Sequence, residues 1–135
     1  MIEGWLEDVY LVLFSEAEID DVSSRYDIER SLPGYVVLGL WGWDDLVVRD
    51  HSGNVYTIPT VPLDQRYLQK AEVPETLNLE PDARFKGKIK WYVKPLAFGG
   101  DPGAKENLVW VTHKEHSQLV AWWNKKYLAL NRQDS

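Results

Sequence analysis

Two histidines near the C-terminal end have the types and spacing that metal chemistry requires. His113 and His116 are three residues apart, with Glu115 between them, and imidazoles at that spacing on a helix can share one metal ion. No third ligand is visible at a compatible position, and two-ligand patterns are weak evidence for a metal site. His51 has no serine or cysteine nucleophile with which to form a catalytic pair. We therefore expect no catalytic residues, no metal and no cofactor, with His116 as an interior histidine.

A glycine-rich segment at residues 99–105 has some features of a phosphate-binding loop. Its glycine spacing is wrong, and no serine or threonine follows Lys105 to hold magnesium. Asp101 would also stand where a phosphate needs amide donors. We interpret the segment as a tight turn with backbone positions at positive φ.

The stretch Gly39-Leu-Trp-Gly-Trp-Asp-Asp-Leu-Val-Val-Arg49 has the composition of a protein-binding site. Strand alternation would point Trp41 and Trp43 to one face. If that face is inward they anchor the core, which is the interpretation favoured by the usual burial of large aromatics. If it lies at a sheet edge, the two indoles beside Asp44 and Asp45 make a hot spot for a partner.

Charge is distributed unevenly along the chain. The net charge is −6, which argues against sequence-independent nucleic-acid binding, because that affinity comes from lysine and arginine. Residues 3–29 hold nine acidic side chains and one base, Arg25. We expect a basic protein partner to contact this region through Glu16, Glu18, Asp20 and Asp21, although a solvated helical face without any partner is the alternative.

The chain of 135 residues, with 44% apolar residues, predicts a single globular domain over residues 1–135. It has no cysteine, and its first residues do not have the pattern of a secretory signal. Its longest apolar run, residues 9–14, is shorter than the roughly 20 residues that span a bilayer. We expect a cytoplasmic protein that does not bind membranes.

The first half of the chain predicts helices and then strands. Apolar residues at helical spacing favour a helix over residues 2–13, with a buried strand at residues 9–14 as the alternative. Ser15 and Glu18 form a capping box that predicts a second, short helix. Residues 35–40, 46–48 and 55–58 read as strands, with a turn at residues 51–54.

The second half predicts two more strands and one long helix. Residues 62–84 read as a loop, residues 89–93 as a half-buried strand with a basic outer face, and residues 107–111 as a strand. Thr112 and Glu115 form a second capping box before a helix that docks on the sheet; on that helix Trp122 lies outside the apolar stripe. The fold class is α+β, with a mostly antiparallel sheet packed by N-terminal helices and a C-terminal helix.

Residues 26–39, 46–50 and 52–59 resemble the SUKH superfamily (Smi/Knr-type) of bacterial immunity proteins. The resemblance is carried by Leu32-Pro-Gly-Tyr35 at the entry to a strand and by Gly53-Asn-Val-Tyr-Thr-Ile-Pro59. The chain departs from the pattern at residues 40–45, where the family often has a run of glycines, and after Pro59, where a proline-broken loop replaces an acidic helix.

The resemblance implies a non-enzymatic SUKH-like domain that binds a cognate toxin and blocks its active site. The acidic surplus fits a basic toxin such as a nuclease, because complementary charge speeds encounter. A regulatory or scaffolding adaptor of the same fold is the alternative. An enzyme that uses His113 and His116 with a metal is the third hypothesis. The toxin and the oligomeric state stay open.

Overall fold

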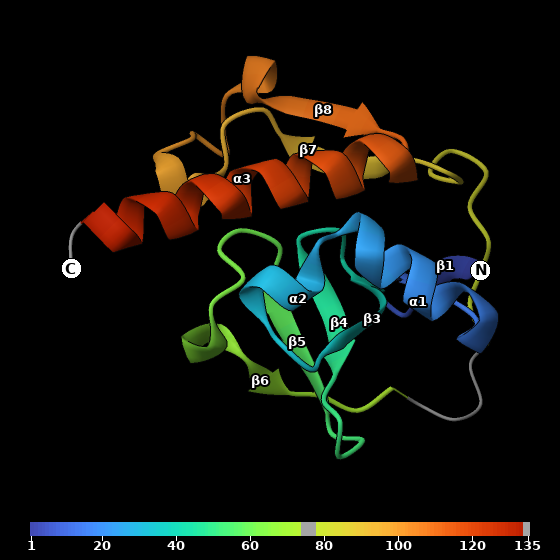
Figure 1. The fold of residues 1–135 in the computed structure, drawn as a ribbon. Coiled ribbons are helices and arrows are strands. Elements are labelled where there is room, and N and C mark those ends of the chain that lie inside the picture. The colour runs from blue at the N-terminus through green and yellow to red at the C-terminus, as the bar shows by residue number, and fades with distance from the viewer. Residues whose placement is uncertain (74–77, 134–135) are drawn as a thin grey trace.

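A six-stranded antiparallel sheet forms the centre of the molecule (Figure 1). The computed structural model describes residues 1–73 and 78–133. The strands pair in chain order, each antiparallel to the next. They are β1 (Ile2–Leu6), β2 (Val9–Leu13), β3 (Val36–Trp41), β4 (Asp45–Arg49), β5 (Val55–Pro59) and β6 (Gln69–Lys70).

The N-terminal segment is a hairpin, so the expected helix over residues 2–13 is wrong. The strand alternative at residues 9–14 holds for β2, whereas β1 was not predicted. Leu6 pairs with Val9 across a two-residue turn, in which Glu7 adopts a φ of 56°. The residues of β2 are β-branched, aromatic or leucine, and Gly4 disfavours a helix in β1. Local helical spacing was overridden because β2 is buried between β1 and β3.

The capping box at Ser15 and Glu18 begins α1 (Glu16–Arg25), as predicted. The Glu18 carboxylate accepts a hydrogen bond from the Ser15 amide at 2.9 Å. A short helix, α2 (Ile28–Ser31), follows and ends before Pro33. Both helices pack on β3.

The predicted strands of the second half form a separate two-stranded sheet, β7 (Ile89–Tyr92) and β8 (Leu108–Val111). The described part of the chain also contains three short 3-10 helices: η1 (Gln65–Tyr67), η2 (Leu96–Phe98) and η3 (Lys105–Asn107). Gly99, at a φ of 88°, ends η2, so the glycine-rich segment is the turn that was predicted.

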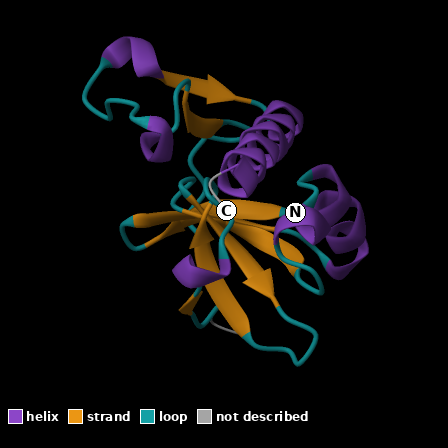
Figure 2. Cartoon of the chain, turned by 60° about the vertical axis from the view of Figure 1, so that its left-hand side comes forward, coloured by secondary structure: helices purple, strands orange, loops and turns teal. Residues whose placement is uncertain are grey.

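The long helix α3 (His113–Gln133) begins at the predicted capping box: the Glu115 carboxylate accepts from the Thr112 amide, and the Thr112 hydroxyl accepts from the Glu115 amide. It lies between the two-stranded sheet and the rest of the fold in both ribbon views (Figures 1 and 2). Its close neighbours are α1, α2 and β7. The predicted docking of this helix on the sheet was therefore incomplete, because α3 also packs on two helices and on the second sheet.

One buried cluster joins these layers. It includes Val12, Leu40 and Ile58 of the large sheet, Trp91 of β7 and Val120 of α3. Within the described residues, no helix combines the length and apolar character needed to cross a membrane.

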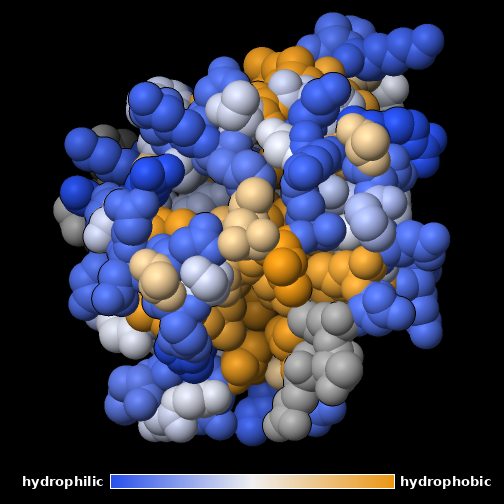
Figure 3. Space-filling model, turned by 90° about the vertical axis from the view of Figure 1, so that its right-hand side faces the viewer, coloured by the Kyte–Doolittle hydropathy of each residue, from blue (hydrophilic) through white to orange (hydrophobic). Residues whose placement is uncertain are grey.

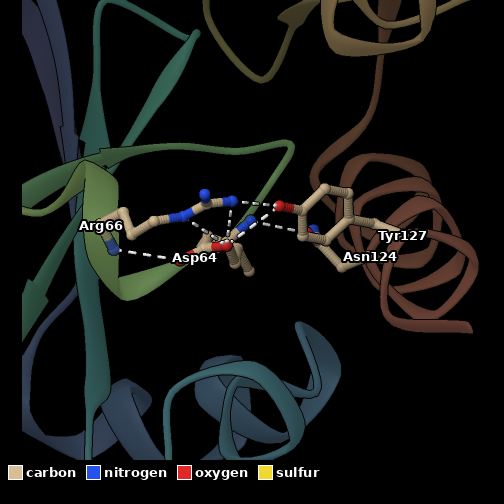
Figure 4. Close-up of polar contacts among 5 residues, drawn as sticks. Asp64, Arg66, Asn124 and Tyr127 are labelled. Atoms are coloured by element: carbon tan, nitrogen blue, oxygen red, sulfur yellow. Dashed lines mark hydrogen bonds and ion pairs between the residues drawn. The ribbon is translucent and has the colours of Figure 1, made fainter. Parts of the chain in front are cut away.

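A polar network fastens α3 to the segment after β5 (Figure 4). The buried amide of Asn124 accepts from the Leu63 N–H and donates to the Thr60 carbonyl, each at 2.7 Å. The Tyr127 hydroxyl donates to Asp64 at 2.9 Å, which also binds Arg66. These bonds hold the end of β5, and with it the β4–β5 side of the candidate site, at a fixed distance from α3.

Candidate partner-binding surface

The turn between β3 and β4 holds Trp43 in an unusual backbone conformation. β3 ends at Trp41, which pairs with Asp45, and Gly42 and Trp43 both adopt a φ of 64°. Glycine accepts this left-handed region readily, whereas a bulky residue is rarely found there. Strained positions of this kind persist only where surrounding contacts hold them, and they cluster at functional sites.

Aromatic side chains supply those contacts. The Trp43 ring stacks on Tyr10 with the centroids 5.0 Å apart and meets Trp110 edge-on at 5.1 Å. Phe85 and Trp5 complete this aromatic cluster. Trp43 is therefore half-buried against the core, whereas Trp41 is half-buried and does not belong to the core cluster. The alternation that would have placed both on one face stops at Trp41, because the turn begins there.

Asp44 and Asp45 differ in their surroundings. The exposed Asp44 carboxylate accepts a hydrogen bond from the Lys90 ammonium of β7 at 3.0 Å. Burial alone would lower the pKa of Lys90, but the bond to Asp44 raises it above its ordinary value. Asp45 is half-buried, and burial together with the neighbouring Asp44 charge raises the pKa of its carboxyl. The turn thus carries one paired carboxylate and one that is partly desolvated.

The outer face of the two-stranded sheet adjoins this turn. Lys90 pairs with Trp110 and Tyr92 pairs with Leu108 across the strands, so these four side chains share one face. Trp110 is 41% exposed although it packs on Trp43 and Phe85. The predicted basic outer face of β7 is thus an aromatic and basic surface. We call these four residues, together with Asp44 and Asp45, the turn–hairpin surface.

The acidic residues of α1 lie elsewhere. Glu16 pairs with Arg49, which ends β4, whereas Asp45 begins it. Glu18 lies 2.6 Å from the Met1 amine, and Asp21 pairs with Arg25, while Asp20 is exposed. The two acidic groups predicted to contact a partner therefore lie at opposite ends of β4 and do not form one surface.

His116 lies in the interior of the protein. His116 is fully buried, and its Nδ1 lies 2.6 Å from the Tyr26 hydroxyl, which agrees with its expected interior position. Glu115, at the helix start, is exposed, and its carboxylate accepts the capping hydrogen bond from the Thr112 amide. Among residues 1–73 and 78–133, no group of three or more His, Cys, Asp or Glu side chains is positioned to hold a metal ion.

A hollow lies on another face of the molecule, away from the turn–hairpin surface. Figure 3 shows apolar side chains gathered around it, on the side of the molecule that carries the N-terminus and β1. Its volume is about 590 Å³, and its lining includes Ile2, Tyr10 and Leu79. Its lining residue Asp82 pairs with Arg84, but the described residues of its lining include no tryptophan. We therefore place the candidate site at the turn–hairpin surface.

Trp110, Tyr92 and Phe85 were not among the site residues predicted from the sequence. Alternation along residues 108–111 carried a usable signal, because Val109 and Val111 are the inward side chains, which leaves Leu108 and Trp110 outward. No local pattern indicated that the β3–β4 turn would meet β7, since these segments are joined only by tertiary packing.

Scans against protein-family models, curated proteins and solved structures find no significant match to this chain.

Proposed function

We propose that this protein is an immunity protein that binds a cognate bacterial toxin or effector and neutralises it by direct contact. The observation that carries the proposal is Trp110, exposed at 41% yet held in place by Trp43 and Phe85. Tryptophan, tyrosine and arginine dominate the energetics of protein interfaces, and rigid aromatic anchors lose little entropy on binding. The resemblance to the SUKH superfamily supplies the class of partner.

Charge around this anchor supports specific recognition. Asp44 and Lys90 form an ion pair beside Trp110, and Asp45 lies next to them without a cationic partner among the described residues. This mixture of charges disfavours partners whose charges do not match it, because bringing like charges together costs roughly several kcal/mol. The partner on this proposal presents basic side chains near Asp45.

Co-expression with the product of the neighbouring gene tests the proposal. We expect a complex that co-purifies and a host cell that survives a toxin it otherwise does not tolerate. A Trp110→Ala variant that folds normally should lose both the complex and the protection. If the unmodified protein gives neither, the immunity role is wrong; a complex without any protection would instead favour the regulatory or scaffolding adaptor.

A further inference from the structure

A small cavity opens between the β3–β4 turn, the end of β5 and β7. Its volume is about 220 Å³. This is below the roughly 300 Å³ at which pockets for drug-sized ligands begin, so it suits one side chain or a fragment of similar size. Its lining includes Trp43, Asp44, Asp45, Lys90, Trp91 and Tyr92.

The charges in this cavity do not balance. Two carboxylates and one ammonium line it, and the ammonium of Lys90 is committed to Asp44 at 3.0 Å. The Asp45 carboxylate has neither an ion pair nor a hydrogen bond from another side chain in the described part of the molecule. Burial and the Asp44 charge both raise the pKa of the Asp45 carboxyl, which means that its charge lacks compensation. A cation entering the cavity would supply that compensation.

The aromatic walls favour the same kind of guest. Cations are attracted to the faces of tryptophan and tyrosine, and guanidinium groups also stack on them. Trp91 lines the cavity and is only 5% exposed. The Lys90 ammonium already lies 5.2 Å from the centre of the Tyr92 ring, so this surface holds one cation against an aromatic side chain.

We propose that this cavity binds one arginine side chain of the partner, with the guanidinium group against the Asp45 carboxylate and the aromatic walls. The inference rests on the proposed function, because it names the group that a basic partner would insert beside Trp110. Arginine fits better than lysine because its planar guanidinium can bind a carboxylate through two hydrogen bonds and stack at the same time.

The test uses a small probe and a neutral match for it. N-acetyl-arginine amide is titrated into the full chain, and the indole N–H resonances of all seven tryptophans are followed by NMR. We expect the resonances of Trp43 and Trp91 to shift in a saturable way and that of Trp122 on α3 to stay in place. N-acetyl-citrulline amide has nearly the same shape without the charge, and it should give no saturable shift.

Two variants test whether Asp45 is the carboxylate that binds the arginine probe. Asp45→Asn should reduce the affinity for the arginine probe at least tenfold, whereas Asp8→Asn, an exposed carboxylate in the β1–β2 turn, should leave it unchanged. Equal shifts with arginine and citrulline probes, or undiminished binding by Asp45→Asn, would overturn the inference. If Asp45→Asn fails to fold, the comparison of the two probes on the unmodified protein still decides. Loss of the toxin complex with retained arginine binding would refute the immunity role alone.

Discussion

The Tyr26 hydroxyl at the end of α1 and Nδ1 of His116 on α3 form a buried hydrogen bond of 2.6 Å between residues 90 positions apart. Trp91 meets the His116 ring edge-on from β7. Burial raises the pKa of Tyr26 above its usual range, and burial, assisted by the nearby His113, lowers the pKa of His116 to about 3. The bond therefore joins two neutral groups, and the contact between Trp91 and His116 links them to the second sheet.

This bond makes stability depend on pH. Near neutral pH His116 is uncharged in both the folded and the unfolded chain. As pH falls below about 6.5, the ordinary histidine pKa, the unfolded chain binds a proton that the folded chain excludes. We expect the free energy of unfolding to fall by up to about 1.4 kcal/mol per pH unit for this histidine. Urea unfolding between pH 7 and 5 measures that slope.

A variant isolates the contribution of His116. His116→Phe should lower the free energy of unfolding at pH 7 but flatten its dependence on pH. His113, whose pKa is also lowered by burial, should leave a residual slope. His51→Gln changes an exposed turn residue and serves as the control. An unchanged slope in His116→Phe would contradict the assignment.

Asn124 is predicted to be a key residue for the attachment of α3. Asn124→Ala leaves the Leu63 N–H and the Thr60 carbonyl without the bonds that they make at 2.7 Å. Because buried polar groups without partners are costly, we expect a loss of about 2 to 4 kcal/mol in the free energy of unfolding. Asn131→Ala, an exposed change on the same helix, should stay within about 0.5 kcal/mol. Equal effects of the two variants in thermal or urea unfolding would show that the polar network carries little stability.

Charge reversal distinguishes the two acidic surfaces. Asp44→Lys should slow association with the partner about tenfold at low salt and alter dissociation less, because exposed charges act mainly on encounter. The same substitution should change the free energy of unfolding by only about 1 kcal/mol, since the pair with Lys90 is partly exposed. The double variant Asp20→Lys and Asp21→Lys on α1 should leave the rate unchanged. The reverse pattern in stopped-flow or surface plasmon resonance measurements would move the interface to α1.

Trp110 should behave as an interface anchor. We expect Trp110→Ala to weaken the complex by about 2 kcal/mol or more, or roughly 30-fold in Kd, mostly through faster dissociation. Trp122→Ala removes a side chain that is more exposed, at 55%, but lies on α3 outside the turn–hairpin surface, and it should bind normally. Circular dichroism would establish that both variants are folded. Similar affinities of the two variants for the partner would place the anchor elsewhere.

The sequence predicted those elements whose signals are local. Both capping boxes begin helices as expected, since Ser15 with Glu18 and Thr112 with Glu115 satisfy amides of their own first turn. The strands at residues 36–41 and 55–59 follow from β-branched runs and a glycine turn. Periodicity misled at residues 2–13, where six apolar positions fit a helix but pairing with β3 decides the structure.

Only part of the candidate site could be predicted from the sequence. Asp44 and Asp45 stood out by composition, but their different environments depend on Lys90 and on the depth of the turn. The group formed with Trp110 arises because Trp43 bends back at positive φ onto the aromatic cluster. Contacts between segments that lie far apart in the chain leave no short-range pattern to read.

The position of α3 between the two sheets also has a consequence for folding. The six strands of the large sheet pair with neighbours in chain order, so their contacts close short loops and can form early. The bond between Tyr26 and His116 spans 90 residues and can form only after α3 has been synthesised. During translation the buried faces of α1, α2 and β7 therefore emerge from the ribosome before the helix that covers them, and we expect this interval to be when the chain is most prone to aggregate.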